Sequence, residues 1–383
     1  MSDAERPIYL DYNATTPVAP EVLEAMLPYL REEFGNPSST HPYGRRARAA
    51  VERAREQVAR LLDASAEEIL FTSGGTEANN LAIRGVMLAR PERRHILTST
   101  IEHPATALPC RHLERSHEVS WVGVDAEGRV RLEQATAMLR SDTALVTLIH
   151  ANNETGVLQP VGELAAAART AGAVVHTDAA QTVGKVPVSV GELHVDLLTV
   201  VGHKLYAPKG VGALYVRRGT PLKPFALGGG QEHGRRPGTE NVPYIVGLGA
   251  ACELARGRLA QDTAEMLELR ERLWWRLQAE VPGMRLNGHP TQRLPNTLNV
   301  RFPGVLGSAV LAGAPQVAAS TGSACHEGGE TASSVLLAMG LPPQEALGAV
   351  RLTLGHGTTA EEVDVAAAAL ARAWRVASGV SGR

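Results

Sequence analysis

The sequence predicts an α/β protein with a mostly parallel sheet, followed by a smaller α+β domain. In the first part of the chain, short apolar runs rich in β-branched residues alternate with amphipathic helical stretches, which is typical of parallel strands joined by helices. Beyond one long helical region, about 243–280, the composition shifts after Gly283 to shorter strands and helices. A chain of 383 residues is also too long for one ordinary core, so we expect two domains.

The first part opens with a short strand that begins at Ile8 and runs into a polar turn. Predicted helices follow from about 20, 43, 77, 104 and 162. The predicted strands of this part are 69–72, 95–99, 119–124, 144–149, 173–177, 197–201 and 211–216. In the second part, the predicted short elements are 296–301, 308–311, 317–320, 333–339, 350–354 and 361–377.

The composition argues against several function classes. An apolar fraction of 44% and a net charge of −2 fit a globular protein with no general attraction to nucleic acid or anionic membranes. We expect no signal peptide, and no apolar run is long enough to span a bilayer. Cys110, Cys252 and Cys325 lie far apart without C-x-x-C spacing, so we expect no disulfide framework and no metal site. A reducing compartment, the cytoplasm, is therefore expected.

Polar clusters follow five of the predicted strands. They are Ser73-Gly74-Gly75-Thr76, Glu102-His103, Asn152-Asn153-Glu154, Asp178-Ala179-Ala180-Gln181 and His203-Lys204. Ligands of parallel α/β sheets bind at the carboxyl ends of the strands, so five clusters at this edge predict one site. The first cluster also precedes a helix, where free backbone N–H groups form an anion cradle, although an ordinary turn gives the same pattern. It lacks the Gly-Lys-Ser/Thr ending of a nucleotide-binding P-loop.

The last of these clusters places Lys204 at the end of a buried strand. A lysine there is solvated, paired or used covalently, and an amine whose pKa is lowered by burial can attack an aldehyde to form an imine. Taken singly, the residues have plainer interpretations: a surface lysine in a turn, a helix cap for Asp178 and a turn histidine for His103. Those interpretations do not explain why such residue types fall at successive strand ends.

Together the clusters match a ligand that carries an aldehyde, a phosphate and a pyridine nitrogen, which is pyridoxal 5'-phosphate. Lys204 would form the imine, and Asp178 would pair with the protonated ring nitrogen and keep the ring an electron sink. His103 would stack on the ring or shuttle a proton.

The remaining polar groups suit the phosphate and the ring hydroxyl of the same ligand. Gly75, Thr76 and the neighbouring N–H groups, with His203, would bind the phosphate. Asn153 and Gln181 would form hydrogen bonds with the ring hydroxyl.

Eight sequence motifs follow one another over nearly the whole chain. They are Leu10-Asp11-Tyr12-Asn13-Ala14-Thr15-Thr16-Pro17, Thr72-Ser73-Gly74-Gly75-Thr76-Glu77, Glu102-His103, Asn152-Asn153-Glu154-Thr155-Gly156, His176-Thr177-Asp178-Ala179-Ala180-Gln181, Gly202-His203-Lys204, Arg236-Pro237-Gly238-Thr239 and Gly322-Ser323-Ala324-Cys325. In this order they resemble the cysteine desulfurase and selenocysteine lyase family, class V enzymes of fold type I that use pyridoxal 5'-phosphate. The resemblance implies a large domain, residues 15–260, with a mostly parallel seven-stranded sheet, and a small α+β domain, residues 1–14 and 261–383.

The resemblance also implies roles for single residues. Lys204 matches the lysine that carries the cofactor imine, and Asp178 the residue that pairs with the pyridine nitrogen. Thr239 matches the residue that reaches the phosphate in the other subunit, which implies a homodimer with sites at the interface. Arg351 matches the arginine that grips the substrate carboxylate, and a surface strand arginine is the plainer alternative.

The small domain is expected to carry the second reactive group, Cys325, in a glycine-rich stretch at about 321–332. The matching cysteine of the family attacks the substrate's sulfur, becomes a persulfide and leaves alanine. Asn13 and Asn153 are the other expected substrate contacts. Cys110 and Cys252 are expected to be buried structural thiols.

Two positions depart from the family pattern. Val201 stands where many desulfurases have a serine that holds the phosphate, and His356 replaces a common arginine. The leading prediction is an L-cysteine desulfurase, with a selenocysteine lyase as the close alternative because both need the same residues. An aminotransferase-like enzyme and a catalytically inactive relative are the more distant alternatives. The sequence leaves open the preference for sulfur or selenium and the protein that accepts the persulfide.

Overall fold

The computed structural model describes residues 6–322 and 331–379, and its centre is a seven-stranded sheet. In spatial order the strands are β2 (Ile69–Thr72), β8 (Gly212–Val216), β7 (Leu197–Val201), β6 (Val174–Asp178), β5 (Thr143–Ile149), β3 (His95–Ser99) and β4 (Glu118–Val122). β8 runs antiparallel to both of its neighbours, and the other pairs are parallel. The predicted α/β fold class with a mostly parallel seven-stranded sheet is confirmed.

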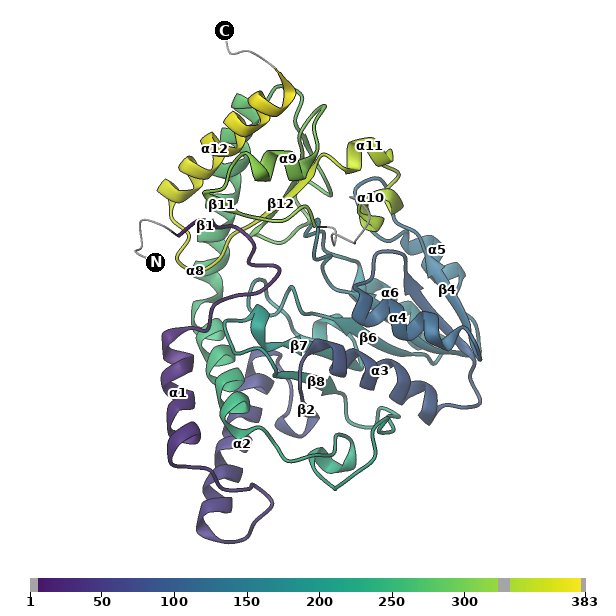
Figure 1. Cartoon of the computed structure of the whole chain (residues 1–383). Helices are drawn as coiled ribbons and strands as arrows, with labels where there is room; N and C mark the ends of the chain where they lie inside the picture. The colour runs from purple at the N-terminus through teal and green to yellow at the C-terminus, as the bar shows by residue number, and fades with distance from the viewer. Residues whose placement is uncertain (1–5, 323–330, 380–383) are drawn as a thin grey trace.

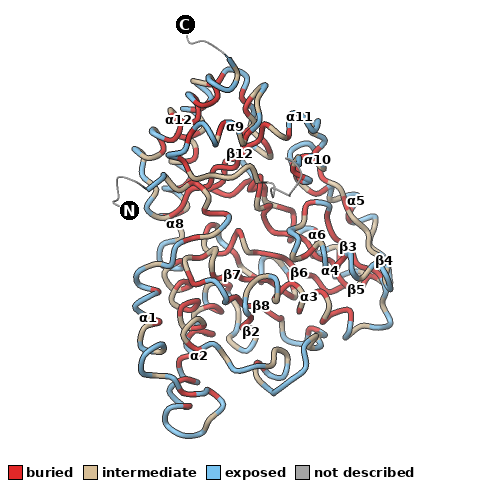
Figure 2. Tube along the Cα trace, viewed as in Figure 1, coloured by how far each residue is buried: buried red, intermediate tan, exposed pale blue. Residues whose placement is uncertain are grey.

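Alternate residues of these strands enter two hydrophobic clusters, one on each face of the sheet. One cluster contains Leu70, Ile96, Leu145, Val174, Leu197 and Leu214. The other contains the next residue of five strands and the preceding one of β8: Phe71, Leu97, Val146, Val175, Leu198 and Ala213. Because successive side chains of a strand point to opposite faces, burial on both faces requires the continuous apolar runs seen in the sequence. The strands accordingly form the buried centre of the large lobe in Figure 2.

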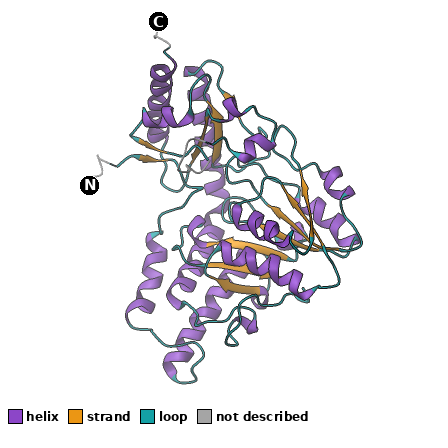
Figure 3. Cartoon of the chain, turned by 45° about the vertical axis from the view of Figure 1, so that its right-hand side comes forward, coloured by secondary structure: helices purple, strands orange, loops and turns teal. Residues whose placement is uncertain are grey.

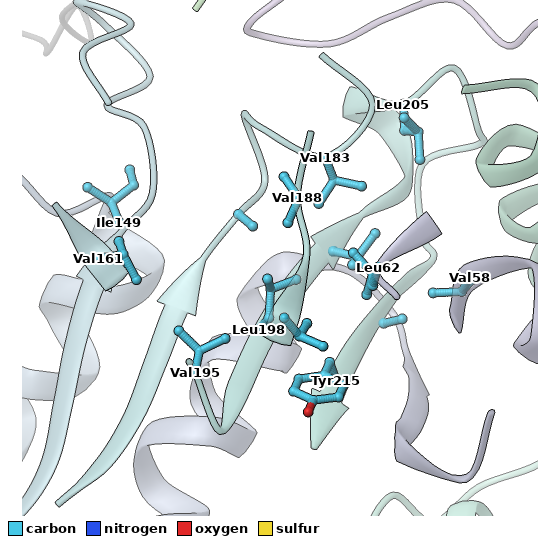
Figure 4. Close-up of a cluster of buried hydrophobic side chains, with 14 of the residues drawn as sticks. Val58, Leu62, Ile149, Val161, Val183, Val188, Val195, Leu198, Leu205 and Tyr215 are labelled. Carbon is cyan, nitrogen blue, oxygen red and sulfur yellow. The ribbon is translucent and has the colours of Figure 1, made fainter. Parts of the chain in front are cut away.

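Helices cover both faces of this sheet (Figure 3). α3 (Gly75–Ala89) and α4 (Pro104–Leu113) contribute residues to the first cluster. α2 (Pro42–Leu61), α6 (Val161–Thr170), α7 (Val190–Leu193), α5 (Leu132–Ala137) and α1 (Pro20–Arg31) contribute to the second. Figure 4 shows part of this second cluster, where Val58 and Leu62 lie beside the strands that carry Leu198 and Tyr215.

The remaining strands form two small sheets outside the large one. β10 (Thr297–Arg301) pairs antiparallel with β12 (Ala349–Thr353) and with β9 (Arg285–Leu286), and β1 (Ile8–Tyr9) pairs parallel with β11 (Val317–Ala318). α9 (Gly307–Ala312) and α12 (Ala360–Ser378) share a third hydrophobic cluster with β10, β12 and Leu10. α10 (Ser334–Ala338) and α11 (Pro343–Ala346) instead contribute residues to the second cluster of the large sheet. The division into domains at residues 14 and 260 stays a prediction.

The predicted long helix is α8 (Val242–Glu280). Its first half packs with α1 and α2 below, and its second half with α12 above (Figure 1). The described residues also include the 3-10 turns η2 (Ala66–Glu68), η3 (Gly202–Lys204) and η4 (Glu232–Gly234). In the part of the chain that the structure describes, no helix combines the length and the apolar character that a membrane span requires.

Candidate active site

Ten of the residues that the sequence singles out line one cavity at the carboxyl edge of the large sheet. The cavity has a volume of about 400 Å³. The ten are Asn13, Gly75, Thr76, His103, Asn153, Asp178, Gln181, His203, Lys204 and Arg351. Thr239 is exposed and is not in this lining, and Cys325 lies outside the described residues. The cavity thus combines residues that follow the sheet strands with Asn13 from the start of the chain and Arg351 from near its end.

The start of α3 forms one wall of the cavity. Gly74 caps the helix with a φ of 146°, and Gly75 and Thr76 open its first turn. The first N–H groups of a helix have no partner inside it, so they can donate to an anion. A Cβ on Gly75 would lie 2.6 Å from Cγ2 of Val201, so this helix start needs glycine to approach the end of β7. Val201 itself lines the cavity and offers no hydrogen bond there.

Lys204 ends the 3-10 turn η3 that directly follows β7. Its Nζ donates to the backbone oxygens of Asn13, at 2.5 Å, and Ala14, at 2.6 Å. Burial and, to a smaller extent, the charge of Arg351 lower the pKa of Lys204, the carboxylates of Asp11 and Asp178 partly offset this, and the resulting pKa is about 8. A substantial fraction of the amine is therefore neutral near physiological pH, and the neutral form is the nucleophile.

Asp178 ends β6 and is 5% exposed. One carboxylate oxygen accepts a hydrogen bond from Nδ2 of Asn79 at 2.8 Å, and the other accepts one from the N–H of Ala180 at 3.0 Å. The sequence analysis did not single out Asn79. Its signal is the spacing, because it follows Gly75 by four positions and so lies on the same face of α3.

His103 both caps a helix and lines the cavity, so the two interpretations of this residue hold together. Its Nδ1 accepts a hydrogen bond from the N–H of Ala105 at 3.1 Å, at the start of α4. In the neutral ring, Nε2 therefore carries the proton. Loss of water around the ring lowers the pKa of His103, the charge of Asp178 partly offsets this, and the charge of Lys204 lowers the pKa further.

His203 is held in its neutral form next to Lys204. Its Nδ1 lies 3.2 Å from Oγ1 of Thr15, and its carbonyl oxygen accepts from the N–H of Thr16 at 2.9 Å. Burial lowers the pKa of His203 to about 4, with the charges of Lys204 and Lys209 adding to the effect. At neutral pH the uncharged ring offers an N–H donor.

Arg351 enters the cavity from β12 with its side chain only 7% exposed, which excludes the surface arginine that was the plainer alternative. Nη2 lies 2.7 Å from Oδ1 of Asp11, and Nη1 donates to the backbone oxygen of Asn153 at 3.1 Å. Nε is buried and has no hydrogen-bond partner among the described residues. A buried guanidinium N–H without an acceptor suits a bound anion. Asp11 belongs to a quoted motif, but its pairing with Arg351 was not predicted.

Both amide N–H groups of Asn13 are engaged within the protein. Nδ2 donates to the backbone oxygen of Asn153 at 3.2 Å and to Oγ1 of Thr297 at 2.9 Å, and Oδ1 accepts from Nδ2 of Asn296 at 3.2 Å. The backbone oxygen of Asn13 accepts from Nε2 of Gln181 at 3.0 Å. Asn13 thus connects the N-terminal segment, the large sheet and β10 at the cavity wall.

Three further residues of the sequence analysis lie away from the cavity. Nε2 of His356 lies 3.2 Å from a carboxylate oxygen of Asp262 on α8, and the centroid of its ring lies 4.4 Å from that of Tyr206. The replacement of the common arginine by His356 therefore changes contacts outside the cavity. Cys110 and Cys252 are buried free thiols, as expected. Burial raises the pKa of Cys110 to about 12 and raises that of Cys252 as well, which makes both unreactive.

Comparisons with known proteins cover almost the whole chain. Residues 8–365 match the aminotransferase class-V family. A protein named cysteine desulfurase 2, from Trichormus variabilis, is 49% identical over 360 residues, which are 93% of this chain and 90% of that protein. A solved structure titled NifS-like protein has a TM-score of 0.89 and 38% identity, and covers 96% of this chain and 98% of that chain. Another, titled SspA in complex with cysteine, has a TM-score of 0.81 and 37% identity, and covers 90% and 98%. The chain therefore belongs to the class-V aminotransferase family and is similar throughout to its cysteine desulfurases.

Proposed function

We propose that this chain is a cysteine desulfurase, which converts L-cysteine to L-alanine and passes the sulfur, as a persulfide on Cys325, to an acceptor. One observation carries the proposal: Lys204, with its lowered pKa, and Arg351, with its unpartnered N–H, line the same cavity. An α-amino acid needs both, because its amino group must react while its carboxylate is held. The relative named cysteine desulfurase 2 and the structure of SspA in complex with cysteine support this choice of substrate.

The family is generally dependent on pyridoxal 5'-phosphate, and the donor set of the cavity fits this cofactor. Lys204 offers an amine to its aldehyde, and Asp178 a carboxylate to its ring nitrogen. The start of α3 at Gly75 and Thr76, with His203, offers N–H and hydroxyl donors to its phosphate, although Val201 adds none. When bound, the cofactor supplies an electron sink for the negative charge that develops at Cα of the substrate.

Two orphaned polar atoms support the fit of a ligand to this cavity. Oδ1 of Asn79 and Nε of Arg351 are buried, have no hydrogen-bond partner among the described residues and belong to residues of the lining. Buried polar groups are nearly always hydrogen-bonded, so such atoms are expected where a ligand or ordered water completes the site. Gln181 and Asn153 line the same cavity and provide amide groups for the ring hydroxyl.

We assign the handling of the substrate to three side chains. Arg351 binds the carboxylate with its planar fork of donors. Lys204 moves the proton at Cα, because an amine with a pKa near 8 both accepts and donates a proton near neutral pH. His103 contributes the N–H at Nε2 and moves a second proton. Asn13, whose two amide N–H groups are engaged within the protein, positions the cavity wall, and its amide oxygen accepts one hydrogen bond there and keeps a second lone pair for the substrate contact that the resemblance implies.

The sulfur transfer is assigned to Cys325. Its thiolate attacks the sulfur of the bound cysteine, so that a sulfur–sulfur bond forms while the bond between Cβ and sulfur breaks. The electron pair of the broken bond stays with the carbon fragment, which takes up protons and leaves as alanine. A free thiol is needed for this step, which is consistent with the expected reducing compartment, the cytoplasm.

We further propose that the protein works as a homodimer and passes its sulfur to another protein. Thr239 is exposed and lies outside the cavity of its own chain, so it is available to the site of a second copy. The identity of the acceptor protein stays open.

The decisive experiment is alanine release by the purified protein, measured with L-cysteine and with L-selenocysteine side by side under reducing conditions. Turnover of cysteine that is lost in Cys325→Ala supports the desulfurase. Turnover of selenocysteine with little or none from cysteine would replace it by a selenocysteine lyase. Cysteine turnover that survives Cys325→Ala would point to chemistry without a persulfide, and no alanine from either substrate would refute both assignments.

A further inference from the structure

Lys185 is a buried lysine that the proposed chemistry does not use. It is 6% exposed and lies in the turn after β6, four residues beyond Gln181. Its Nζ donates a hydrogen bond to Oε1 of Gln181 at 3.0 Å. The charged groups that act on it most strongly, Lys204 and Arg351, are both positive. Lys185 is therefore buried without a compensating negative charge among its described neighbours.

Such a residue is costly for the fold, so packing alone does not account for it. Burial, together with the smaller effects of the positive charges of Lys204 and Arg351, lowers the pKa of Lys185 to about 7. An apolar side chain of similar length would fill the same volume without this desolvation. The hydrogen bond to Gln181 is what the amine provides that a methionine would not.

The backbone gives the side chain little freedom to point elsewhere. Oγ1 of Thr263 on α8 lies 2.9 Å from the backbone oxygen of Lys185 and 2.6 Å from that of Leu259, so its hydroxyl is shared between the two. The preceding Gly184 has a φ of 76°, and a Cβ there would lie 2.1 Å from Cδ1 of Leu205. Figure 4 shows Leu205 and Val183 in the same buried cluster. The turn is thus fixed against both α8 and the residue that follows Lys204.

Two hydrogen bonds, one from Lys185 and one to the backbone oxygen of Asn13, set which way the Gln181 amide faces. An amide has one oxygen that accepts and one NH2 group that donates, whereas an ammonium only donates. Oε1 of Gln181 must therefore face Lys185, and Nε2 faces the other way, where one N–H donates to the backbone oxygen of Asn13 at 3.0 Å. The second N–H of Nε2 remains for the cavity that Gln181 lines.

We propose that Lys185 is a positioning residue for the cofactor: by holding Oε1 of Gln181, it fixes the amide with an N–H toward the cavity, where it donates to the ring hydroxyl oxygen of pyridoxal phosphate. The proposal rests on the proposed function, because it takes this cavity as the cofactor site. Lys185 acts only through Gln181 and does not touch the cofactor.

The test measures the dissociation constant of pyridoxal phosphate for the apoprotein, together with the position of the visible absorption band of the bound cofactor. Lys185→Met should weaken binding about tenfold and move the band, since a hydrogen bond to an oxygen that carries negative charge is lost or misdirected. Gln181→Leu should weaken binding at least as much and move the band in the same direction. In the Gln181→Leu background, adding Lys185→Met should change the dissociation constant less than about twofold, because the two residues act as one unit.

Two further variants serve as controls. Lys185→Gln keeps a donor for Oε1 and should restore most of the affinity and the band position. Lys209→Met removes an exposed lysine whose charge also acts on His203, and it should leave both quantities unchanged.

Other results would contradict either the role of Lys185 or the proposed function. An unchanged dissociation constant in Lys185→Met, or effects that simply add in the double variant, would overturn the positioning role. If Lys185→Met does not fold, then full affinity in Gln181→Leu overturns it as well. Failure of the unmodified apoprotein to bind pyridoxal phosphate would instead refute the proposed function.

Discussion

At the scale of single residues, several basic side chains lie around Lys204. The charges of Lys204 and Arg351 lower the pKa of Lys185, the charge of Arg351 lowers that of Lys204, and the neighbouring His203 is held neutral. The nearby negative charges are the carboxylates of Asp178, which accepts a hydrogen bond from Asn79, and of Asp11, which pairs with Arg351. This concentration of basic groups favours an anionic ligand. Both pyridoxal phosphate and a substrate carboxylate are anionic.

Replacing Arg351 by lysine tests the carboxylate contact. A lysine keeps the charge but loses the planar fork and the unpartnered Nε, so we expect KM for L-cysteine to rise roughly 10- to 100-fold with a smaller change in kcat. Steady-state alanine release measures both constants. Arg301→Lys is the control, because Arg301 lies on β10 outside the cavity and pairs with Glu345. An unchanged KM in Arg351→Lys would remove the residue from the substrate site.

The lowered pKa of Lys185 predicts a pH-dependent stability. Between about 7 in the folded apoprotein and the ordinary value of about 10.4, the unfolded chain holds a proton that the folded chain has lost, so stability rises with pH across this window. Below pH ~7 both states are protonated, and the folded state bears the full cost of the buried charge.

Lys185→Met should therefore stabilise the apoprotein by roughly 3 kcal/mol at pH ~6.5, and by much less at pH ~9.5. Urea unfolding of both proteins at the two pH values measures the difference. Lys209→Met should change neither value by more than a few tenths of a kcal/mol. Equal stabilities of the parent and Lys185→Met at both pH values would mean that the amine keeps its ordinary pKa.

Sequence reasoning finds residues that follow strand ends and misses those that act through them. Lys204, Asp178 and His103 stand in polar clusters directly after apolar runs, so their position was predictable. Asn79, on α3, and Lys185, in the turn after β6, each follow a predicted site residue by four positions, and that spacing is too common in helices and turns to mark a site. Only the fold shows that their side chains turn toward the site and not toward solvent.

At the scale of elements, one cavity receives residues at or after the ends of β3, β5, β6 and β7, the start of α3 that follows β2, the segment after β1, and Arg351 of β12. β2, β3, β5, β6 and β7 all point the same way in the sheet, which brings the residues after them to one edge. β8 runs in the opposite direction and contributes none to the lining. The sequence predicts the strands by their continuous apolar runs, but their spatial order depends on pairing between distant segments and cannot be derived from local pattern.

The close approach of α3 to β7 gives a prediction at this scale. Gly75→Ala places a Cβ 2.6 Å from Cγ2 of Val201 and pushes the start of the helix away from the phosphate site. We expect the dissociation constant of pyridoxal phosphate to rise at least about tenfold. Val201→Ala removes the clashing methyl group, so the double variant Gly75→Ala/Val201→Ala should recover most of the lost affinity. Absence of recovery would show that glycine is needed there for another reason.

At the scale of the whole molecule, the site lies on the seam between the large sheet and the small sheets. Asn13 contacts both sides of this seam, with hydrogen bonds to Asn153 after β5 and to Thr297 on β10. Arg351 also crosses it, from β12 to the backbone of Asn153. Contacts between residues so far apart in sequence were predictable only from the resemblance to a family, and Thr239 shows the limit of a single chain, since its expected contact lies in a second copy.

The proposed homodimer predicts complementation between two defective chains. Lys204→Ala should abolish turnover, and Thr239→Ala should weaken cofactor binding about tenfold, each in its own homodimer. In a heterodimer of the two variants, one site has neither Lys204 nor a partner's Thr239, whereas the other has Lys204 in its own chain and an intact Thr239 from the partner. That second site is complete, so the heterodimer, isolated with two different affinity tags, should bind one cofactor per dimer with parental affinity and release alanine at about half the parental rate. If Thr239 served its own chain, then the chain with Lys204 would carry the defective Thr239→Ala beside it, and no site would regain the parental affinity. The two arrangements of subunits are thus distinguished by one titration of the isolated heterodimer.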